Sequence, residues 1–473
     1  MRHPIRSFLA MAAVAWSASD AGAVALNPRG IGEALIYPYY TVNAGQDTLV
    51  TVDNVSDIGK VAKVFIREGA NGRVVMDFLV FLAPHDSWSG AISSSGDAAL
   101  GRIGTSDHSC VDHWTSNPQP FSTASFEGSR VWRTPDRTRE GMIEIINAGD
   151  IVPGSPLALA TTPVQDGTLN GGTPTCAGIS DDAGLIPYLQ PPTDGLIGTA
   201  AIVNVAQGTF YPYTAQALSG FSDRVLIENG ATVWNGLDRA NSDDAATGTA
   251  RAKLVTANGD PLSIDYARGI DAVSAVFMAD HLYNDYLVNP AIGAATDWIV
   301  TFPTRAFYVD KQRYPGDTTA PFENPSDDYA SPLTTAFASY DREALVLTSR
   351  CPPGLPDCFA RFPYQVNVVP VSSSGAPSIL STRLSNEQVL SATGQSGHID
   401  LNLGSAAHVL HGGKLDDGTA VDLLGLPVTG FMVYNVINTQ AQPGRLANYG
   451  GLFQHRTTMS CTIRGSDYIV ICP

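Results

Sequence analysis

Short runs of β-branched and aromatic residues recur along the chain, and each run ends at Gly, Pro, Asn or Asp. This pattern is typical of β-strands joined by turns. Asn71-Gly72 lies between two such runs and tolerates the positive φ angles of a tight hairpin. Pro84 ends the pairing because it has no N–H to donate. The region predicts an antiparallel β-meander with strands over residues 48–53, 61–67 and 73–82.

Further runs of the same kind follow, and the chain holds 45 Gly and 31 Pro. The predicted later strands cover 142–146, 199–205, 298–302, 307–309, 344–348, 364–371 and 431–437. Many short strands separated by turn residues favour an all-β fold of β-sandwich domains, immunoglobulin-like or related, with long Gly/Pro-rich loops.

A few short helices are expected as well. Asp280 is a candidate N-cap for a helix that runs to Asn289, where Pro290 stops it. Ser405 is a candidate N-cap for a second helix that ends at Gly412.

The N-terminus has the three parts of an export signal. Arg2 and Arg6 precede an apolar run over residues 8–16 that is too short to span a bilayer. Two overlapping small-residue motifs follow, Ala21-Gly22-Ala23 and Ala23-Val24-Ala25, and either fits a signal peptidase. The sequence therefore predicts a signal peptide over residues 1–25 and a mature chain that begins at Val24 or Leu26.

No later run approaches the roughly 18 apolar residues of a membrane helix, so no transmembrane segment is expected after signal removal. The predicted location is extracellular, cell-surface or periplasmic. The chain has 473 residues, which favours two domains in the mature protein. We expect an N-terminal β-sandwich domain over 26–218 and a C-terminal β-rich domain over 219–473.

The formal net charge is −17. An acidic surface repels phosphate backbones, so no nucleic-acid partner is expected.

The cysteines are even in number and all follow the signal segment, which predicts disulfides formed in an oxidising compartment. Several connectivities are possible, and the simplest pairs neighbours along the chain. The absence of any C-x-x-C excludes thioredoxin-like and zinc-ribbon motifs. The expected disulfide cysteines are Cys110, Cys176, Cys351, Cys358, Cys461 and Cys472.

Three stretches resemble a family of uncharacterised exported or cell-surface proteins of Gram-negative bacteria. They are Gly32-Glu-Ala-Leu-Ile-Tyr-Pro-Tyr-Tyr40, Asp77-Phe-Leu-Val-Phe-Leu-Ala-Pro-His-Asp-Ser-Trp88 and Asp297-Trp-Ile-Val-Thr-Phe-Pro-Thr-Arg-Ala-Phe-Tyr-Val-Asp310. The resemblance spans both halves of the chain and implies export. It carries no known activity and transfers no catalytic residue.

The densest polar cluster is Asp107-His-Ser-Cys-Val-Asp-His113, in which His108 and His113 are candidate metal ligands beside two carboxylates. The spacing of the two histidines matches no standard ligand motif. A polar loop anchored by a disulfide at Cys110 and packed under Trp114 is the favoured interpretation.

A second candidate cluster contains His398, Asp400, His408 and His411. On the predicted helix, His408 and His411 would share one face, and His398 could complete a metal site. A structural role at the end of the helix is favoured, because imidazolium interacts well with exposed carbonyls there.

A third cluster, Asp280-His281 with Asp285, could supply an acid/base set. A helix N-cap followed by a solvated face is the commoner explanation of the same residues.

No nucleophile elbow, P-loop, dinucleotide fingerprint or H-E-x-x-H motif occurs in the sequence. No metal or other cofactor is expected, and the catalytic residues of any activity are unknown at this point. The favoured hypothesis is an exported non-enzymatic β-protein that binds, adheres or assembles at the cell surface or outside the cell. Its partner would be a protein, a polysaccharide or a second copy of itself.

Two alternatives stay open. One is a secreted hydrolase with a metal-based or Asp/His-based site. The other is a subunit of a surface layer or fibre that pairs through exposed strand edges.

Overall fold

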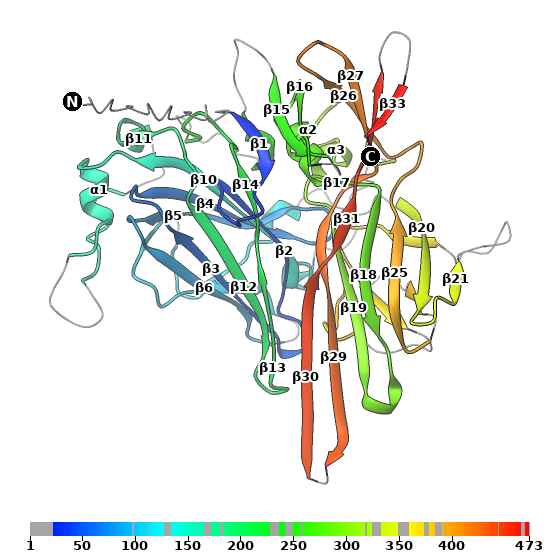
Figure 1. The fold of residues 1–473 in the computed structure, drawn as a ribbon. Helices are drawn as coiled ribbons and strands as arrows, with labels where there is room; N and C mark the ends of the chain where they lie inside the picture. The colour runs from blue at the N-terminus through cyan, green and yellow to red at the C-terminus, as the bar shows by residue number, and fades with distance from the viewer. Residues whose placement is uncertain are drawn as a thin grey trace, which may run out of the picture.

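β-Strands dominate the chain, and three short α-helices accompany them in the described residues: α1 (Pro156–Thr161), α2 (Gly269–Phe277) and α3 (Ala306–Val309). The prediction of an all-β, sandwich-type fold is therefore confirmed (Figure 1). The computed structural model describes residues 22–96, 99–112, 114–126, 134–164, 172–179, 183–227, 236–241, 249–256, 259–316, 319–323, 333–348, 359–372, 378–383, 390–392, 394–442, 444–464 and 469–472.

The N-terminal half forms a sandwich. One layer has the strand order β14 (Gln216–Ser219), β2 (Ala34–Thr41), β10 (Glu140–Ile151), β4 (Lys60–Glu68), β5 (Val74–Leu82) and β8 (Cys110–Val111), and β11 (Leu189–Gln190) also pairs with β10. The facing layer has the order β13 (Thr209–Thr214), β12 (Leu196–Asn204), β3 (Asp47–Asn54), β6 (Ser87–Ser94), β7 (Gly101–Gly104) and β9 (Gln119–Pro120). The rings of Phe78 and Trp88 meet between the layers, 5.6 Å apart.

The C-terminal half forms a second sandwich. One sheet has the order β24 (Leu390–Ser391), β23 (Val366–Ser372), β19 (Ala294–Thr301), β29 (Thr429–Gln442) and β30 (Arg445–Gln454). The other, called here the outer sheet, has the order β21 (Val346–Thr348), β20 (Leu333–Asp341), β25 (Ser396–Asn402), β18 (His281–Leu287) and β31 (Arg456–Thr458), and β22 (Phe359–Phe362) also pairs with β20. Trp298 joins the two sheets, because its Nε1–H donates to the Asp285 carbonyl at 3.3 Å.

The sheet of the first sandwich continues past the predicted domain boundary near Ser219. Beyond β14 it adds β1 (Ala23–Leu26), β15 (Ala250–Val255), β16 (Pro261–Tyr266), β26 (Val409–Lys414), β27 (Ala420–Leu424), β32 (Ser460–Arg464) and β33 (Ile469–Cys472). A small separate sheet pairs β17 (Met278–Ala279) with β28 (Leu426–Pro427). The division into domains at this point stays a prediction, and a 14-stranded sheet runs across it.

The predicted meander is wrong in one respect. The hairpin of β4 and β5 forms as expected around Asn71-Gly72, where Gly72 has a φ of 73°. The preceding strand, β3, lies in the opposite layer and pairs with β12 and β6 instead. Its alternating burial suits a strand with one covered face, whereas every residue of β4 is buried.

Both predicted helices are wrong. The segment from Asp280 to Asn289 contains strand β18, which pairs antiparallel with β25 on one side and β31 on the other. Residues after Ser405 form a turn and then strand β26. The predicted strand over 307–309 is also wrong, because these residues lie in α3.

Among the residues that the structure describes, no helix is long and apolar enough to cross a membrane.

Candidate functional site

The first candidate cluster forms a loop beside a disulfide. Cys110 on β8 is bonded to Cys176, and His108 is exposed. Asp112 is buried, and its Oδ1 accepts a hydrogen bond from the Leu79 backbone N–H. Trp114 packs edge-on against the Phe78 ring at 5.3 Å. These contacts match a loop anchored by a disulfide, and His113 lies outside the described residues.

The remaining predicted disulfide cysteines are described only in part. Cys461 is disulfide-bonded, and its backbone pairs with that of Cys472 across β32 and β33. Cys351 and Cys358 lie outside the described residues.

His408 and His411 do not meet His398. His408 is buried, with Nδ1 at 2.8 Å from the Leu403 carbonyl and Nε2 at 3.1 Å from Glu323 Oε1. His411 is exposed and contacts Asp422 at 2.9 Å. The two imidazoles therefore have separate partners, and the proposed shared helix face does not exist because the segment is a strand.

The other candidates from two distant segments do come together. Strands β18 and β25 are antiparallel neighbours, and their register places Tyr283 opposite Asp400 and Asp285 opposite His398. Next to β25, Tyr340 of β20 lies opposite His398. Residues directly opposite each other in an antiparallel pair point to the same side of the sheet. These side chains therefore share one face of the outer sheet.

We call this surface the imidazole–tyrosine face. All its members are half-buried or exposed, whereas Leu282, Tyr286, Ile399 and Leu401 on the alternate positions are buried. It consists of His281, Tyr283, Asp285, Tyr340, His398, Asp400 and Arg456.

A short contact between a histidine and a carboxylate lies at one end of this face. His281 Nδ1 lies 2.7 Å from Asp400 Oδ1, and the two side chains are 30% and 22% exposed. The His281 ring stacks on the Tyr283 ring with an interplanar angle of 9° and centroids 5.8 Å apart. Burial raises the pKa of the Tyr283 phenol, and the Asp400 carboxylate adds to this effect. The phenol therefore stays neutral and able to donate a hydrogen bond at pH 7.

A second stack lies two residues along the strands. The rings of Tyr340 and His398 are parallel within 7°, with centroids 4.6 Å apart. Below the face, the Tyr286 hydroxyl donates to the Tyr340 carbonyl at 3.2 Å. The two stacks stand on hydrogen-bonded strands rather than on loops, so their spacing is fixed by the sheet.

His455 lies on the buried side of the same region. Asn284 Nδ2 donates to its Nδ1 at 3.0 Å, and its Nε2–H donates to the Ile299 carbonyl at 3.0 Å. Desolvation lowers the pKa of His455 to about 3. Both ring nitrogens are in use, so this imidazole is neutral and structural.

A recess of about 90 Å³ opens beside His455, where the two halves meet. Its walls come from β1, β14, the end of α2 and the segment around Gly430. It is separate from the imidazole–tyrosine face, to which it contributes no residue.

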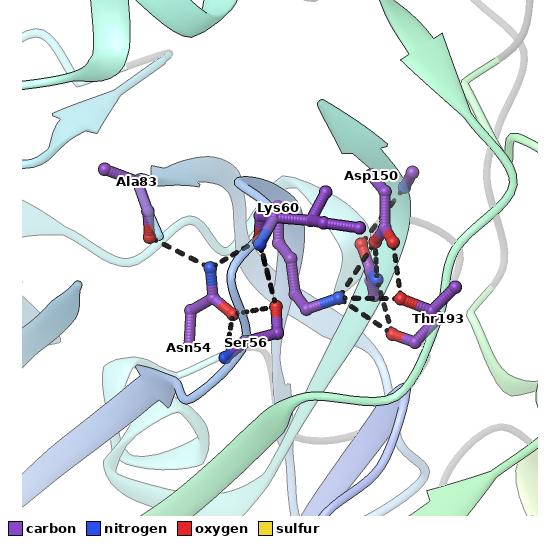
Figure 2. A network of polar contacts seen from close by, with 9 residues as sticks. Asn54, Ser56, Lys60, Ala83, Asp150 and Thr193 are labelled. Carbon is purple, nitrogen blue, oxygen red and sulfur yellow. Dashed lines mark hydrogen bonds and ion pairs between the residues drawn. The ribbon is translucent and has the colours of Figure 1, made fainter. Parts of the chain in front are cut away.

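Several buried ion pairs were not predictable from the sequence. Figure 2 shows one of them, in which Lys60 Nζ lies 2.9 Å from Asp150 Oδ1 and donates to the Thr193 carbonyl at 2.9 Å. Asn147 Nδ2 donates to the same Asp150 oxygen at 2.8 Å. Both charged side chains of the pair are fully buried. A buried and fully bonded network of this kind fixes local structure and offers nothing to a ligand.

Side chains on the imidazole–tyrosine face suit two kinds of chemistry. Flat rings with polar edges bind apolar ring faces and hydroxyl groups together. A histidine oriented by a carboxylate can also act as a base. Within the described residues, no three His, Cys, Asp or Glu side chains gather into a metal-binding group.

No protein-family model matches the chain, and no characterised protein or solved structure is significantly similar to it.

Proposed function

We propose that this chain is an exported, non-enzymatic binding protein that holds a neutral polysaccharide on its imidazole–tyrosine face. The observation that carries the proposal is the pair of parallel ring stacks, His281 on Tyr283 and His398 on Tyr340, on one side of a single sheet. Oxidative folding supports export, since Cys110 and Cys176 are joined.

The chemistry of the face favours a saccharide. Sugar rings present apolar C–H faces and hydroxyl edges, which aromatic rings and charged or amide side chains can contact at once. Asp400 accepts hydrogen bonds and Arg456 donates them, and both border the Tyr283 ring. The net charge of −17 opposes an acidic polymer, so a neutral polysaccharide is the better fit.

The test is affinity electrophoresis of the mature protein through gels that contain neutral α-glucan, β-glucan, xylan or mannan. We expect retardation by at least one of these, and a loss of affinity of about tenfold for Tyr283→Ala or Tyr340→Ala, which corresponds to about 1.4 kcal/mol. His85→Ala is the matched control, because His85 is not part of this face. Its Nε2 lies 2.8 Å from Asp57 Oδ1 in an exposed contact. Failure to bind any of the four polymers contradicts the proposal.

A secreted hydrolase is the second candidate, and the short His281–Asp400 contact favours it. In this role His281 would act as the general base and Asp400 would orient it. Release of reducing ends by the wild type, abolished in His281→Ala and Asp400→Asn but not in His85→Ala, would support the hydrolase over the binding protein. Binding without release would support the opposite assignment.

A further inference from the structure

Strand β1 links the two halves of the large sheet. On one side it pairs antiparallel with β14, where Ala25 lies opposite Ser219. On the other side it pairs parallel with β15, where Ala23 lies opposite Arg251 and Val24 opposite Ala252. Val24 is fully buried and belongs to the hydrophobic core.

Both candidate peptidase sites fall inside this strand, and they differ in what they leave behind. Cleavage after Ala25 would remove Ala23 and Val24, the two residues that pair with β15. The remaining member, Leu26, is 38% exposed and pairs with β14 alone. Cleavage after Ala23 keeps Val24 in the core, the Val24–Ala252 pair and the whole antiparallel pairing with β14.

We infer that the signal peptide is removed at the Ala23–Val24 bond and not at the Ala25–Leu26 bond. This inference rests on the export that the proposed function includes. In the step, the amide bond between the Ala23 carbonyl carbon and the Val24 nitrogen breaks. The hydroxyl group of a water molecule joins the Ala23 carbonyl, and its proton joins the Val24 amine.

The same geometry orders two events. In the folded chain Ala23 is 8% exposed and Val24 is fully buried, and both residues lie within a paired strand. A peptidase needs its substrate extended and accessible, so it must act before β1 enters the sheet. Cleavage therefore precedes closure of the sheet between β14 and β15.

The N-terminal residue of the exported protein tests the inference, with two matched variants. Peptidases of this class require small residues one and three positions before the cut. Ala21→Leu replaces the small residue three positions before the cut after Ala23 and leaves the other site unchanged. Ala25→Leu replaces the small residue directly before the cut after Ala25 and leaves the first site unchanged. We expect wild type and Ala25→Leu to begin at Val24 by intact mass. Ala21→Leu should lose the product that begins at Val24, and remain as precursor or be cut after Ala25 instead.

The possible outcomes are distinct. A wild-type protein that begins at Leu26, or at Gly22, overturns the assigned site and leaves export intact. A protein that keeps Met1 overturns export itself, and with it the proposed function. The mass is read on denatured protein, so the result does not depend on whether a variant folds.

The order of events has its own measurement. Full-length precursor refolded in vitro should resist purified signal peptidase, whereas the same precursor in urea that the enzyme tolerates should be cut. Equal cleavage of the two samples contradicts the order.

Discussion

Two ionisable side chains, Glu33 and His455, are held neutral by burial. Burial raises the pKa of the Glu33 carboxyl to about 8, although the Ser222 N–H donates to its Oε2 at 2.9 Å. Burial lowers the pKa of His455 to about 3. One group therefore resists losing its proton and the other resists gaining one, so each makes stability depend on pH with an opposite slope.

The Glu33 carboxyl should destabilise the fold at alkaline pH. Its pKa is about 8 in the folded chain and near 4.5 in the unfolded chain, so the folded state binds more protons and stability falls as pH rises between these values. Glu33→Gln keeps an acceptor for Ser222 and removes the ionisation. At pH 9 we expect the variant to be more stable by roughly 2–4 kcal/mol in urea unfolding, with little difference at pH 4.5. The exposed Glu343→Gln is the control, and a constant difference across pH contradicts the assignment.

His455 should lower the stability of the fold at acidic pH. The unfolded chain binds a proton near pH 6.5 and the folded chain only near pH 3, so stability falls as pH drops through this interval. His455→Ala loses the hydrogen bonds to Asn284 and Ile299 and is expected to be less stable than wild type at pH 7. The difference in unfolding free energy between wild type and variant should narrow at pH 4. At this pH the unfolded wild-type chain binds a proton that the folded chain does not, and the variant has no such group. Urea midpoints at the two pH values measure this difference, and an unchanged difference would refute the assignment of a neutral imidazole.

At the scale of elements, the segment Ser378–Arg383 is a strap across both sandwiches. Asp297 on β19 accepts from the Ser378 hydroxyl at 2.7 Å and from the Leu380 N–H at 2.9 Å. Glu140 on β10 accepts from the Thr382 hydroxyl and the Arg383 N–H, each at 2.7 Å. Two buried carboxylates, one from each half, therefore hold one short segment in place.

Removing one carboxylate should release the strap. Asp297→Ala leaves the Leu380 N–H without its acceptor, and loss of a buried partner of this kind costs about 1–3 kcal/mol. We expect faster hydrogen exchange over 378–383 by mass spectrometry and little change in distant strands. Asp341→Ala is the control, since Asp341 accepts from the nearby N–H groups of Glu343 and Leu345. Unchanged exchange over the strap in Asp297→Ala would show that the carboxylate does not hold it.

The elements show which parts of the fold the sequence could predict. The hairpin of β4 and β5 was predictable because Asn71-Gly72 determines its turn locally. Strand β18 was mistaken for a helix because Asp280 and Pro290 resemble helix ends. The apolar pair Leu282 and Tyr286 could not correct this, since a spacing of four residues places two side chains on one face of either a helix or a strand. The layer of β3 was not predictable from its own residues, because β12, its partner, lies far along the chain.

The candidate site was predictable only as separate pieces. His281 and Asp285 were named in one cluster and His398 and Asp400 in another. Their contact depends on the register of β18 against β25, which joins residues 119 positions apart in the case of His281 and Asp400. Tyr283 and Tyr340 were missed because each becomes part of the face only through its neighbours on other strands, His398 in the case of Tyr340 and Asp400 in the case of Tyr283.

At the scale of the whole molecule, the disulfide between Cys110 and Cys176 closes a loop with a sequence separation of 66 residues. It ties the edge strand β8 to the segment that follows α1, since the Cys176 N–H donates to the Ala160 carbonyl at 3.1 Å. A crosslink of this length restricts the unfolded chain considerably.

Loss of this crosslink should destabilise the protein. Cys110→Ser with Cys176→Ser is expected to lower the free energy of unfolding by about 2–4 kcal/mol. Urea unfolding of the double variant and of the wild type, both without reductant, measures the difference. Equal midpoints would mean that the remaining contacts of β8 already hold the loop.

The parallel pairing of β1 with β15 also means that β1 is synthesised long before its partner. Ribosomes make β1 first, and its parallel partner emerges roughly 230 residues later. At about 5–20 residues per second, that interval is roughly 10 to 50 s. During this time β1 lacks its β15 partner, and its apolar Val24 is not yet packed in the core. A holding chaperone that binds the short apolar segment of β1 would therefore matter more to this chain than one that acts on the finished sheet.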